Sequence, residues 1–329
     1  MTDIILRGLG HHVPEKLLTN ADLERIVETN DEWIVTRTGI RERRIAEPHT
    51  PLTDLAEPAA RKALADAGMA PEELTHVLVA TFSADCIIPN AACVLAHRLG
   101  LSGLMCMDLS AACSGFLYAV ETARALVALH PEAKILVVGG DMVTSRTNFT
   151  DRSTCVLFGD GAGAAIVTAD AEGLRGGRVL DILLASDGAL GSLLTIRGGG
   201  SGRTYALGET VGPEYFVQMQ GREVYKHAVR NMTAIARRVM EKHGVAVEDI
   251  DVFVPHQANM RILEAVAGRL EIPREKVFAN LDRYGNTSAA SVPLALSEAR
   301  GSGFIRDGQL VLVATFGGGF TWGSALVRW

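Results

Sequence analysis

One cysteine in this sequence stands where a reactive thiol would be placed. Cys113 lies in the segment Asp108-Leu-Ser-Ala-Ala-Cys-Ser-Gly-Phe116, after an apolar run at residues 103–107 that predicts a buried strand. Residues 116–127 have apolar side chains at helical spacing, so the thiol would lie at the positive end of a helix dipole. Such a position favours the thiolate, which is the nucleophilic form, and the small neighbouring side chains leave room for a carbonyl group. A buried, inert cysteine is the alternative, because free cysteine is among the most buried residue types.

Two further segments carry side chains that could assist acyl transfer. His256 comes directly after Pro255 and the predicted strand at 251–254, so it would face the crevice at the carboxyl ends of the strands. Asn286 lies in the segment Gly285-Asn-Thr-Ser-Ala-Ala-Ser291. A neutral imidazole and a carboxamide can both donate hydrogen bonds to a developing oxyanion. Taken singly, each residue also has an ordinary explanation, as a satisfied core or surface histidine and as a Gly-Asn turn or helix cap.

A glycine-rich segment near the end of the sequence could supply backbone donors. Phe316-Gly-Gly-Gly-Phe-Thr-Trp-Gly323 follows a predicted strand at residues 311–315. Consecutive glycines allow backbone N–H groups to approach a substrate oxygen closely. A cysteine nucleophile, a His and Asn pair and glycine amides together make a coherent acyl-transfer site.

Composition bounds the class of protein. The chain has 329 residues, 48% of them hydrophobic, with 34 Gly and 5% aromatic residues, which suits a globular α/β protein with tight strand–helix turns. The net charge is −6 with both signs interspersed, and no basic tract or cationic amphipathic segment predicts a nucleic-acid or membrane partner. The amino terminus does not resemble a secretory signal, and the apolar runs are too short for a membrane span, so we expect a cytoplasmic protein.

The cysteine pattern agrees with a reducing compartment. Five cysteines, with no CxxC spacing, argue against a zinc site and against a secreted disulfide framework. We expect no metal, and we expect four of the five cysteines to be small core residues: Cys86, Cys93, Cys106 and Cys155.

The chain also contains an internal repeat. Three pairs of segments match in the same order: 67–80 with 243–255, 90–101 with 259–272, and 134–140 with 309–317. A repeat of this length predicts two fused copies of one domain, rather than a solenoid. If the copies pack with pseudo-twofold symmetry, equivalent loops meet at their interface, and the Cys113 loop would then lie near Asn286 and His256.

Taken together, these motifs resemble the β-ketoacyl-acyl carrier protein synthase III family of condensing enzymes. The resemblance runs essentially end to end, over the segments 30–41, 108–116, 150–152, 158–164, 255–259, 285–291 and 317–323. Alone, the Gly159-Asp-Gly-Ala-Gly163 segment would be a weak signal, since it lacks the lysine and the spacing of nucleotide-binding loops. The resemblance implies an α/β, thiolase-like fold of two pseudo-symmetric duplicated halves in a layered αβαβα arrangement. We expect residues 1–171 to form the half with the nucleophile and residues 172–329 the half with the His and the Asn.

The resemblance also implies a mechanism. Cys113 would take an acyl group from a short acyl-CoA, and malonyl-acyl carrier protein would then lose CO₂ and condense with it to give a 3-oxoacyl-acyl carrier protein. His256 and Asn286 would stabilise the charge formed on decarboxylation, and the backbone N–H groups of Cys113 and Gly318 would form the oxyanion hole. Acyl-CoA would be a substrate, and no cofactor is implied.

Substrate and partner contacts are implied by the same resemblance. Trp33, Arg37 and Arg152 match adenine-stacking and CoA-binding positions, and Asn259 matches a pantetheine contact. The acidic acyl carrier protein would dock on a basic patch, for which the candidates are Lys226, Arg261 and Arg222, although Arg222 replaces a smaller polar residue of many relatives.

Ile88 would bound the acyl pocket across a homodimer. Some acetyl-preferring relatives carry an aromatic residue at this position, so the aliphatic Ile88 predicts tolerance of a longer or branched primer. Equal or lower activity with butyryl- or isobutyryl-CoA than with acetyl-CoA would count against this prediction.

Several alternatives differ in what they require. A same-fold enzyme of secondary metabolism, of quinolone or polyketide type, would use the same triad and would differ in primer preference. A biosynthetic thiolase would need a second catalytic cysteine near the carboxyl terminus, and no cysteine follows Cys155. Elongating synthases use two histidines, where this chain has Asn286 as the second residue. A non-catalytic binding protein on a degenerate fold would be favoured by loss of a triad residue, and all three are present.

Overall fold

Nine strands form one mixed sheet in the computed structural model, which describes residues 3–171 and 173–329. The first half of the chain contributes five of them: β1 (Ile4–His12), β4 (His76–Ala80), β5 (Met105–Leu109), β6 (Lys134–Asp141) and β7 (Gly161–Ala169). The second half contributes four: β8 (Gly177–Ser186), β11 (Val252–Pro255), β12 (Leu310–Gly317) and β13 (Thr321–Arg328). The two sets are joined where Ile4–Leu6 of β1 pairs with 177–179 of β8.

The two sets of strands have the same topology. The order is β5-β4-β6-β7-β1 in the first half and β11-β12-β13-β8 in the second, where an isolated parallel bridge from Phe253 to Val277 replaces the fifth strand. In each half the central pair, β4 with β6 and β11 with β12, is parallel, and the next two pairings are antiparallel. This equivalence supports the expected duplication, although Glu172, beside the proposed boundary, lies outside the described residues.

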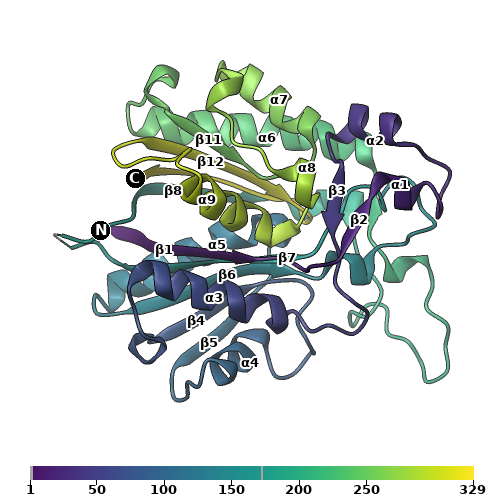
Figure 1. The fold of residues 1–329 in the computed structure, drawn as a ribbon, viewed down its shortest axis with the longest axis horizontal. Coiled ribbons are helices and arrows are strands. Elements are labelled where there is room, and N and C mark those ends of the chain that lie inside the picture. Colours follow the sequence, from purple (N-terminus) through teal and green to yellow (C-terminus); the bar gives the residue numbers. More distant parts are fainter. Residues whose placement is uncertain (1–2, 172) are drawn as a thin grey trace.

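Helices form three layers around the strands, so the arrangement is αβαβα (Figure 1). Two helices, α5 (Gly115–Leu129) and α9 (Ser291–Gly301), lie between the halves and contact strands of both. Helices α3 (Thr53–Ala67) and α4 (Ala91–Arg98) cover the outer face of the first half. Helices α6 (Gly221–Lys242) and α7 (Met260–Leu270) cover that of the second.

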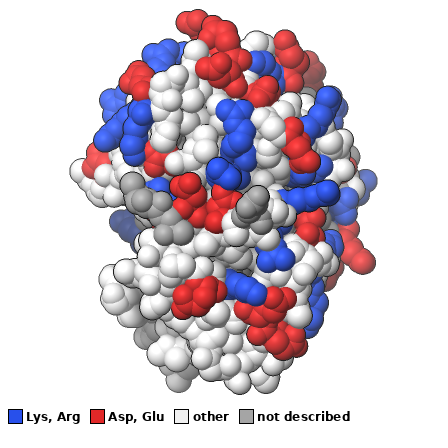
Figure 2. Space-filling model, turned by 90° about the vertical axis from the view of Figure 1, so that its left-hand side faces the viewer, with Lys and Arg blue, Asp and Glu red and all other residues white. Residues whose placement is uncertain are grey.

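Short elements gather beside the carboxyl ends of the central strands. The segment containing β2 (Leu17–Thr19), α1 (Asn20–Leu23), α2 (Asp31–Thr38) and β3 (Glu42–Arg44) lies at one end of the molecule, shown on the right in Figure 1. The remaining strands are β9 (Leu194–Thr195) and β10 (Gln218–Met219), which pair with each other, and the remaining α-helix is the short α8 (Leu281–Tyr284). Figure 2 shows acidic and basic side chains interspersed over one face of the molecule.

Helix α5 has the apolar character that its central place requires. The predicted apolar positions Phe116, Val120, Ala123 and Val127 are all buried in the core between the halves. Residues 112–129 are the one described stretch that is long and apolar enough to cross a membrane. This stretch includes helix α5, which packs against β4, β6 and β7, so its apolar composition is that of a core helix.

Two sequence-based expectations about burial are wrong. The strand expected to be buried at 103–107 is β5, an edge strand whose residues are half-buried or exposed. Of the cysteines expected in the core, Cys155 is buried, whereas Cys86 and Cys93 are exposed and Cys106 is half-buried. Local hydrophobicity could not distinguish a central strand from an edge strand, because that depends on which strands pair.

Candidate active site

Cys113 lies in a short 3-10 turn, residues 112–114, between β5 and α5. The turn begins at Ala112 with a φ of 46°, a left-handed conformation that is uncommon for a residue with a Cβ. Burial raises the pKa of the Cys113 thiol to about 12, and this outweighs the favourable position at the helix start. The place at the helix start therefore does not by itself make Cys113 a thiolate, and the thiol needs a further source of activation.

The glycine segment packs directly against the Cys113 turn. A Cβ on Gly317 would lie 2.6 Å from the Cys113 backbone nitrogen, so only glycine fits at this position. Ser114 Oγ donates to the Thr321 carbonyl at 3.0 Å, and Thr321 Oγ1 donates to the Ala111 carbonyl at 2.8 Å. These contacts hold the two expected oxyanion donors, the N–H groups of Cys113 and Gly318, in neighbouring segments.

His256 is held at the end of β11 by its backbone. Its N–H donates to the Ala314 carbonyl of β12 at 2.8 Å, and its side chain is 2% exposed. Burial lowers the pKa of His256 to about 4, so the imidazole is neutral at physiological pH. A neutral imidazole can donate one hydrogen bond without adding a charge to the site.

Asn286 is oriented by the turn that follows it. Its N–H donates to the Leu157 carbonyl at 2.8 Å, and its own carbonyl accepts from Gly159 N–H at 3.1 Å. The side-chain Oδ1 accepts from Ser288 N–H at 3.0 Å, which leaves the Nδ2 donors available to a ligand. The following residues pack so closely on β6 that a Cβ on Gly139 would lie 2.3 Å from the Ala289 carbonyl oxygen.

The three predicted catalytic residues share one cavity of about 2170 Å³. Cys113, His256 and Asn286 all line it, as does Gly318. Of the predicted substrate and docking residues, six line the same cavity: Trp33, Arg37, Arg222, Lys226, Asn259 and Arg261. The cavity therefore joins the thiol to the surface on which a large substrate would enter.

Trp33 is covered by two guanidinium groups. The guanidinium carbons (Cζ) of Arg37 and Arg152 lie 4.9 and 4.8 Å from the centroid of the Trp33 ring. Arg152 also donates a hydrogen bond to the Glu28 carbonyl at 3.0 Å. A purine that stacks on Trp33 would have to share or displace one of these contacts.

The remaining substrate candidates have structural partners. Asn259 caps α7 by accepting from Arg261 N–H at 2.9 Å. Lys226 pairs with Glu223 at 2.7 Å, and Glu264 also lines the cavity, so the candidate basic patch includes acidic neighbours.

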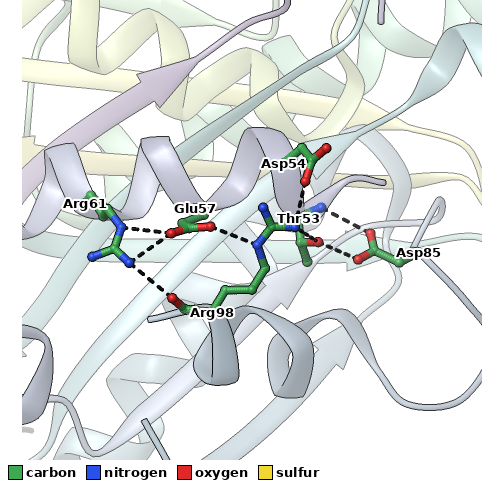
Figure 3. Close-up of polar contacts among 6 residues, drawn as sticks. All are labelled: Thr53, Asp54, Glu57, Arg61, Asp85 and Arg98. Carbon is green, nitrogen blue, oxygen red and sulfur yellow. Dashed lines mark hydrogen bonds and ion pairs between the residues drawn. The ribbon is translucent and has the colours of Figure 1, made fainter. Parts of the chain in front are cut away.

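Ile88 does not line the cavity of its own chain. It is 86% exposed, and its neighbour Ile87, which does reach the cavity lining, is 90% exposed. Figure 3 shows how this loop is attached: Asp85 accepts from Thr53 N and Oγ1 at 3.1 and 2.5 Å, and Arg98 binds Asp54 and Glu57 nearby. The loop therefore presents two exposed apolar side chains side by side.

The sequence analysis missed two polar residues beneath the thiol. Asp141, at the end of β6, and Ser288 are both buried. Burial raises the pKa of the Cys113 thiol and of the Asp141 carboxyl, and the Ser288 hydroxyl opposes this rise in each. An aspartate after an apolar strand was a visible signal, but only the fold shows that it lies behind the cysteine. Among residues 3–171 and 173–329, no cluster of His, Cys, Asp and Glu side chains could hold a metal ion.

The chain is similar to known proteins over its whole length. Residues 107–188 match the family 3-Oxoacyl-[acyl-carrier-protein (ACP)] synthase III, and residues 240–329 match its C-terminal family. Beta-ketoacyl-[acyl-carrier-protein] synthase III of Nitratidesulfovibrio vulgaris is 55% identical over 98% of both chains, and that of Oleidesulfovibrio alaskensis is 54% identical over 99% of both. The crystal structure of 3-oxoacyl-[acyl-carrier-protein] synthase III from Aquifex aeolicus has a TM-score of 0.89 at 44% identity, covering 100% of both chains.

These similarities extend across both halves of the fold and every segment that carries the cavity. The resemblance inferred from the motifs is confirmed, and so is the thiolase-like fold. The chain belongs to the 3-oxoacyl-[acyl-carrier-protein] synthase III family of acyltransferases.

Proposed function

We propose that this protein starts type II fatty acid synthesis by condensing a short acyl-CoA with malonyl-acyl carrier protein. The observation that carries the proposal is the meeting of a thiol, a neutral imidazole and a carboxamide on one cavity. The products are a 3-oxoacyl-acyl carrier protein, CoA and CO₂. Relatives at 54–55% identity bear the name of this synthase, which favours it over a same-fold enzyme of secondary metabolism.

In the first half-reaction, Cys113 attacks the thioester carbonyl of the acyl-CoA. Charge develops on the carbonyl oxygen, where the N–H groups of Cys113 and Gly318 would donate to it. One such donor typically stabilises the transition state by about 3 kcal/mol. Collapse of the intermediate releases CoA and leaves the acyl group on the sulfur.

In the second half-reaction, malonyl-acyl carrier protein loses CO₂, and the electron pair moves toward its thioester oxygen. His256 and Asn286 Nδ2 donate hydrogen bonds to that oxygen without bringing a charge that would attract the leaving carboxylate. The resulting carbanion attacks the acyl carbonyl on Cys113, and the sulfur leaves as a thiolate.

The direct test is reconstitution with defined substrates. The protein is incubated with acetyl-, butyryl- or isobutyryl-CoA and malonyl-acyl carrier protein, and the carrier protein is analysed by mass spectrometry. Formation of the 3-oxoacyl-carrier protein with stoichiometric CO₂ supports the proposal. Condensation with an acyl-acyl carrier protein but not with any acyl-CoA would instead assign the protein to chain elongation.

We also propose that the protein acts as a cytoplasmic homodimer. Strand β5 pairs with β4 on one side and is the edge strand of the described sheet, with Met105 45% exposed, and Ile87 and Ile88 project from the anchored loop. Uncovered edges of this kind favour strand pairing with another chain. The halves 1–171 and 172–329 remain the proposed domains of each protomer, and acyl carrier protein is the proposed docking partner.

The β5 edge gives a testable prediction about assembly. Met105→Glu places a charge on the proposed interface at an exposed position, so it should weaken the dimer at least about tenfold, or ~1.4 kcal/mol, without unfolding the protomer. Analytical ultracentrifugation over a dilution series measures this change. A wild-type protein that is monomeric at micromolar concentration contradicts the proposed dimer.

Ile88 gives a prediction about primer choice. Ile88→Phe adds volume where the partner's loop would bound the acyl pocket, so it should lower kcat/KM for isobutyryl-CoA about tenfold or more, as filling a hydrophobic pocket typically does. Activity with acetyl-CoA should change much less. Steady-state rates over a primer panel provide the measurement, and an equal loss for every primer would argue against a role in primer selection.

A further inference from the structure

Two buried residues next to Cys113 have no part in the mechanism described above. Ser288 is 2% exposed and Asp141 is fully buried. Ser288 begins the 3-10 turn 288–290 before α9 just as Ala112 begins the turn before α5, and both residues have positive φ, 52° and 46°. The two turns contact each other at the junction of the halves, so the Ser288 hydroxyl lies beside the thiol.

The Ser288 hydroxyl is not committed to a structural partner. Among the described residues, Oγ makes no hydrogen bond of full geometry. Ser288 and Cys113 nevertheless line the same cavity on contacting turns, and the adjacent Ala289 N–H donates to Asp141 Oδ2, so the hydroxyl lies close to both groups. Burial raises the pKa of the Cys113 thiol and of the Asp141 carboxyl, and the Ser288 hydroxyl opposes this rise in each. The Ser288 N–H holds Asn286 Oδ1, which fixes the residue while its hydroxyl can turn. A buried hydroxyl between two acidic groups can accept a proton from one and pass its own to the other.

Asp141 has one saturated oxygen and one nearly free oxygen. Its Oδ1 accepts from Thr81 Oγ1, Phe82 N–H and Ser83 Oγ at 2.9, 2.9 and 2.8 Å. Both hydroxyl groups are held as donors to Asp141. The Thr81 oxygen accepts a hydrogen bond from Ser83 N–H, and the Ser83 oxygen accepts one from Met142 N–H. Within residues 3–171 and 173–329, Oδ2 accepts one long hydrogen bond, from Ala289 N–H at 3.3 Å. Burial raises the pKa of Asp141, the three donors to Oδ1 oppose this rise by stabilising the carboxylate, and a lone pair of Oδ2 is left for a proton.

We propose that Ser288 and Asp141 form a proton relay that activates Cys113, an inference that rests on Cys113 being the nucleophile. The thiol proton moves to Ser288 Oγ while the Ser288 proton moves to Asp141 Oδ2, and the electron pair stays on sulfur. The thiolate attacks the acyl-CoA, and the CoA thiolate takes a proton from water. When condensation breaks the acyl–sulfur bond, the Cys113 thiolate leaves and recovers its proton by the reverse path.

The relay solves an electrostatic problem in the buried site. Loss of the thiol proton to water would leave two neighbouring buried anions, and the Asp141 charge accordingly raises the pKa of Cys113. Moving the proton onto Asp141 keeps one negative charge in the site. His256, with its pKa lowered to about 4 by burial, is a poor base for this thiol. The other groups around Asp141, from residues 81–83 and 288–289, are uncharged.

The two routes of deprotonation differ in their pH dependence. Transfer of the thiol proton to Asp141 leaves the total charge of the site unchanged. The equilibrium of this transfer therefore does not depend on pH as long as Cys113 and Asp141 together hold one proton. Transfer to water makes the thiolate fraction rise tenfold per pH unit below the thiol pKa. In the wild type, we expect the rates of Cys113 acylation by acetyl-CoA and of alkylation by iodoacetamide to vary less than about threefold between pH 6.5 and 8.5.

Ser288→Ala and Asp141→Asn test the relay. Quenched-flow mass spectrometry should show acylation at pH 7 lowered about 100-fold in each, as for loss of a general base, and both rates should now rise about tenfold per pH unit. The double variant should lose no more than either single variant, since the two residues act as one unit. Ser302→Ala, an exposed hydroxyl beyond α9, is the matched control and should retain the wild-type rate and pH profile.

The outcomes separate the relay from its premise. Variants that acylate within threefold of the wild type, or a wild-type rate that itself rises tenfold per pH unit, overturn the relay. If Ser288→Ala fails to fold, Ser288→Gly removes the hydroxyl and suits the φ of 52°. Absence of any acyl adduct on wild-type Cys113, while iodoacetamide still alkylates it, rejects the proposed function rather than the relay.

Discussion

Cys113→Ala is expected to abolish the acyl-enzyme and to lower condensation by about 10⁴-fold or more, because Cys113 is the proposed nucleophile, whereas Cys86, the other cysteine that lines the cavity, lies on the exposed loop with Ile87. Intact-protein mass spectrometry after incubation with acetyl-CoA should show an added acetyl group on the wild type and none on the variant. The substitution removes one sulfur from a half-buried turn, so the fold should persist. Thermal unfolding with and without CoA measures this separately.

Cys93→Ala is the matched control for this experiment. Cys93 is exposed on α4 and is not among the residues that line the cavity, so its loss should leave the acyl adduct and the condensation rate unchanged. Peptide mapping of the wild type should place the acetyl group on Cys113 alone. An adduct that persists in Cys113→Ala would show that another nucleophile carries the acyl group and would refute the assigned role.

The meeting of the three proposed catalytic residues on one cavity was predictable from the sequence, because each lies beside a strong local pattern. Cys113, His256 and Asn286 all follow an apolar strand or precede an apolar helix, and the repeat predicted that their loops meet. The duplicated strand order supports that reasoning and explains why residues some 170 positions apart share a cavity.

What the sequence could not give was the environment of each group. The pKa of Cys113 is raised by burial, although its place before a helix suggested the opposite, because desolvation of a buried thiolate exceeds the stabilisation by a helix terminus. The exposure of Cys86 and Cys93 follows from β5 being an edge strand, which is a property of the assembled sheet. Asp141 became a candidate only when the fold placed it next to Ser288.

The arrangement of donors in the second half-reaction suggests why this site uses an amide where elongating enzymes use a second histidine. The Asn286 carboxamide is fixed by its own turn, since Oδ1 accepts from Ser288 N–H at 3.0 Å and Nδ2 is thereby directed away from that contact. This one hydrogen bond fixes the orientation of the carboxamide, whose Nδ2 and Oδ1 could otherwise exchange places. The turn that orients Asn286 also carries the Ser288 hydroxyl, so residues 286–288 would contribute to both proposed half-reactions.

Asn286→Ala and His256→Ala should separate the two half-reactions. Each should still take the acyl group from acetyl-CoA within about tenfold of the wild-type rate, because neither side chain accepts the thiol proton or bonds to the acyl group in the proposed mechanism. Decarboxylation of malonyl-acyl carrier protein should fall about 10²–10³-fold in each, which is the usual effect of removing one oxyanion donor. Release of labelled CO₂, measured beside the acylation rate of the same sample, gives both numbers.

Asn286→Asp makes the test sharper than alanine does. The carboxylate keeps the acceptor for Ser288 N–H, and so keeps the turn, but it replaces the Nδ2 donor by a negative charge where the enolate forms. Decarboxylation should therefore fall further than in Asn286→Ala. Because burial holds the His256 pKa at about 4, wild-type decarboxylation should be constant from pH 6 to 8 and should decline only as the pH falls toward that pKa. An Asn286→Asp variant that decarboxylates as fast as the wild type would show that Asn286 acts through its acceptor and not its donor.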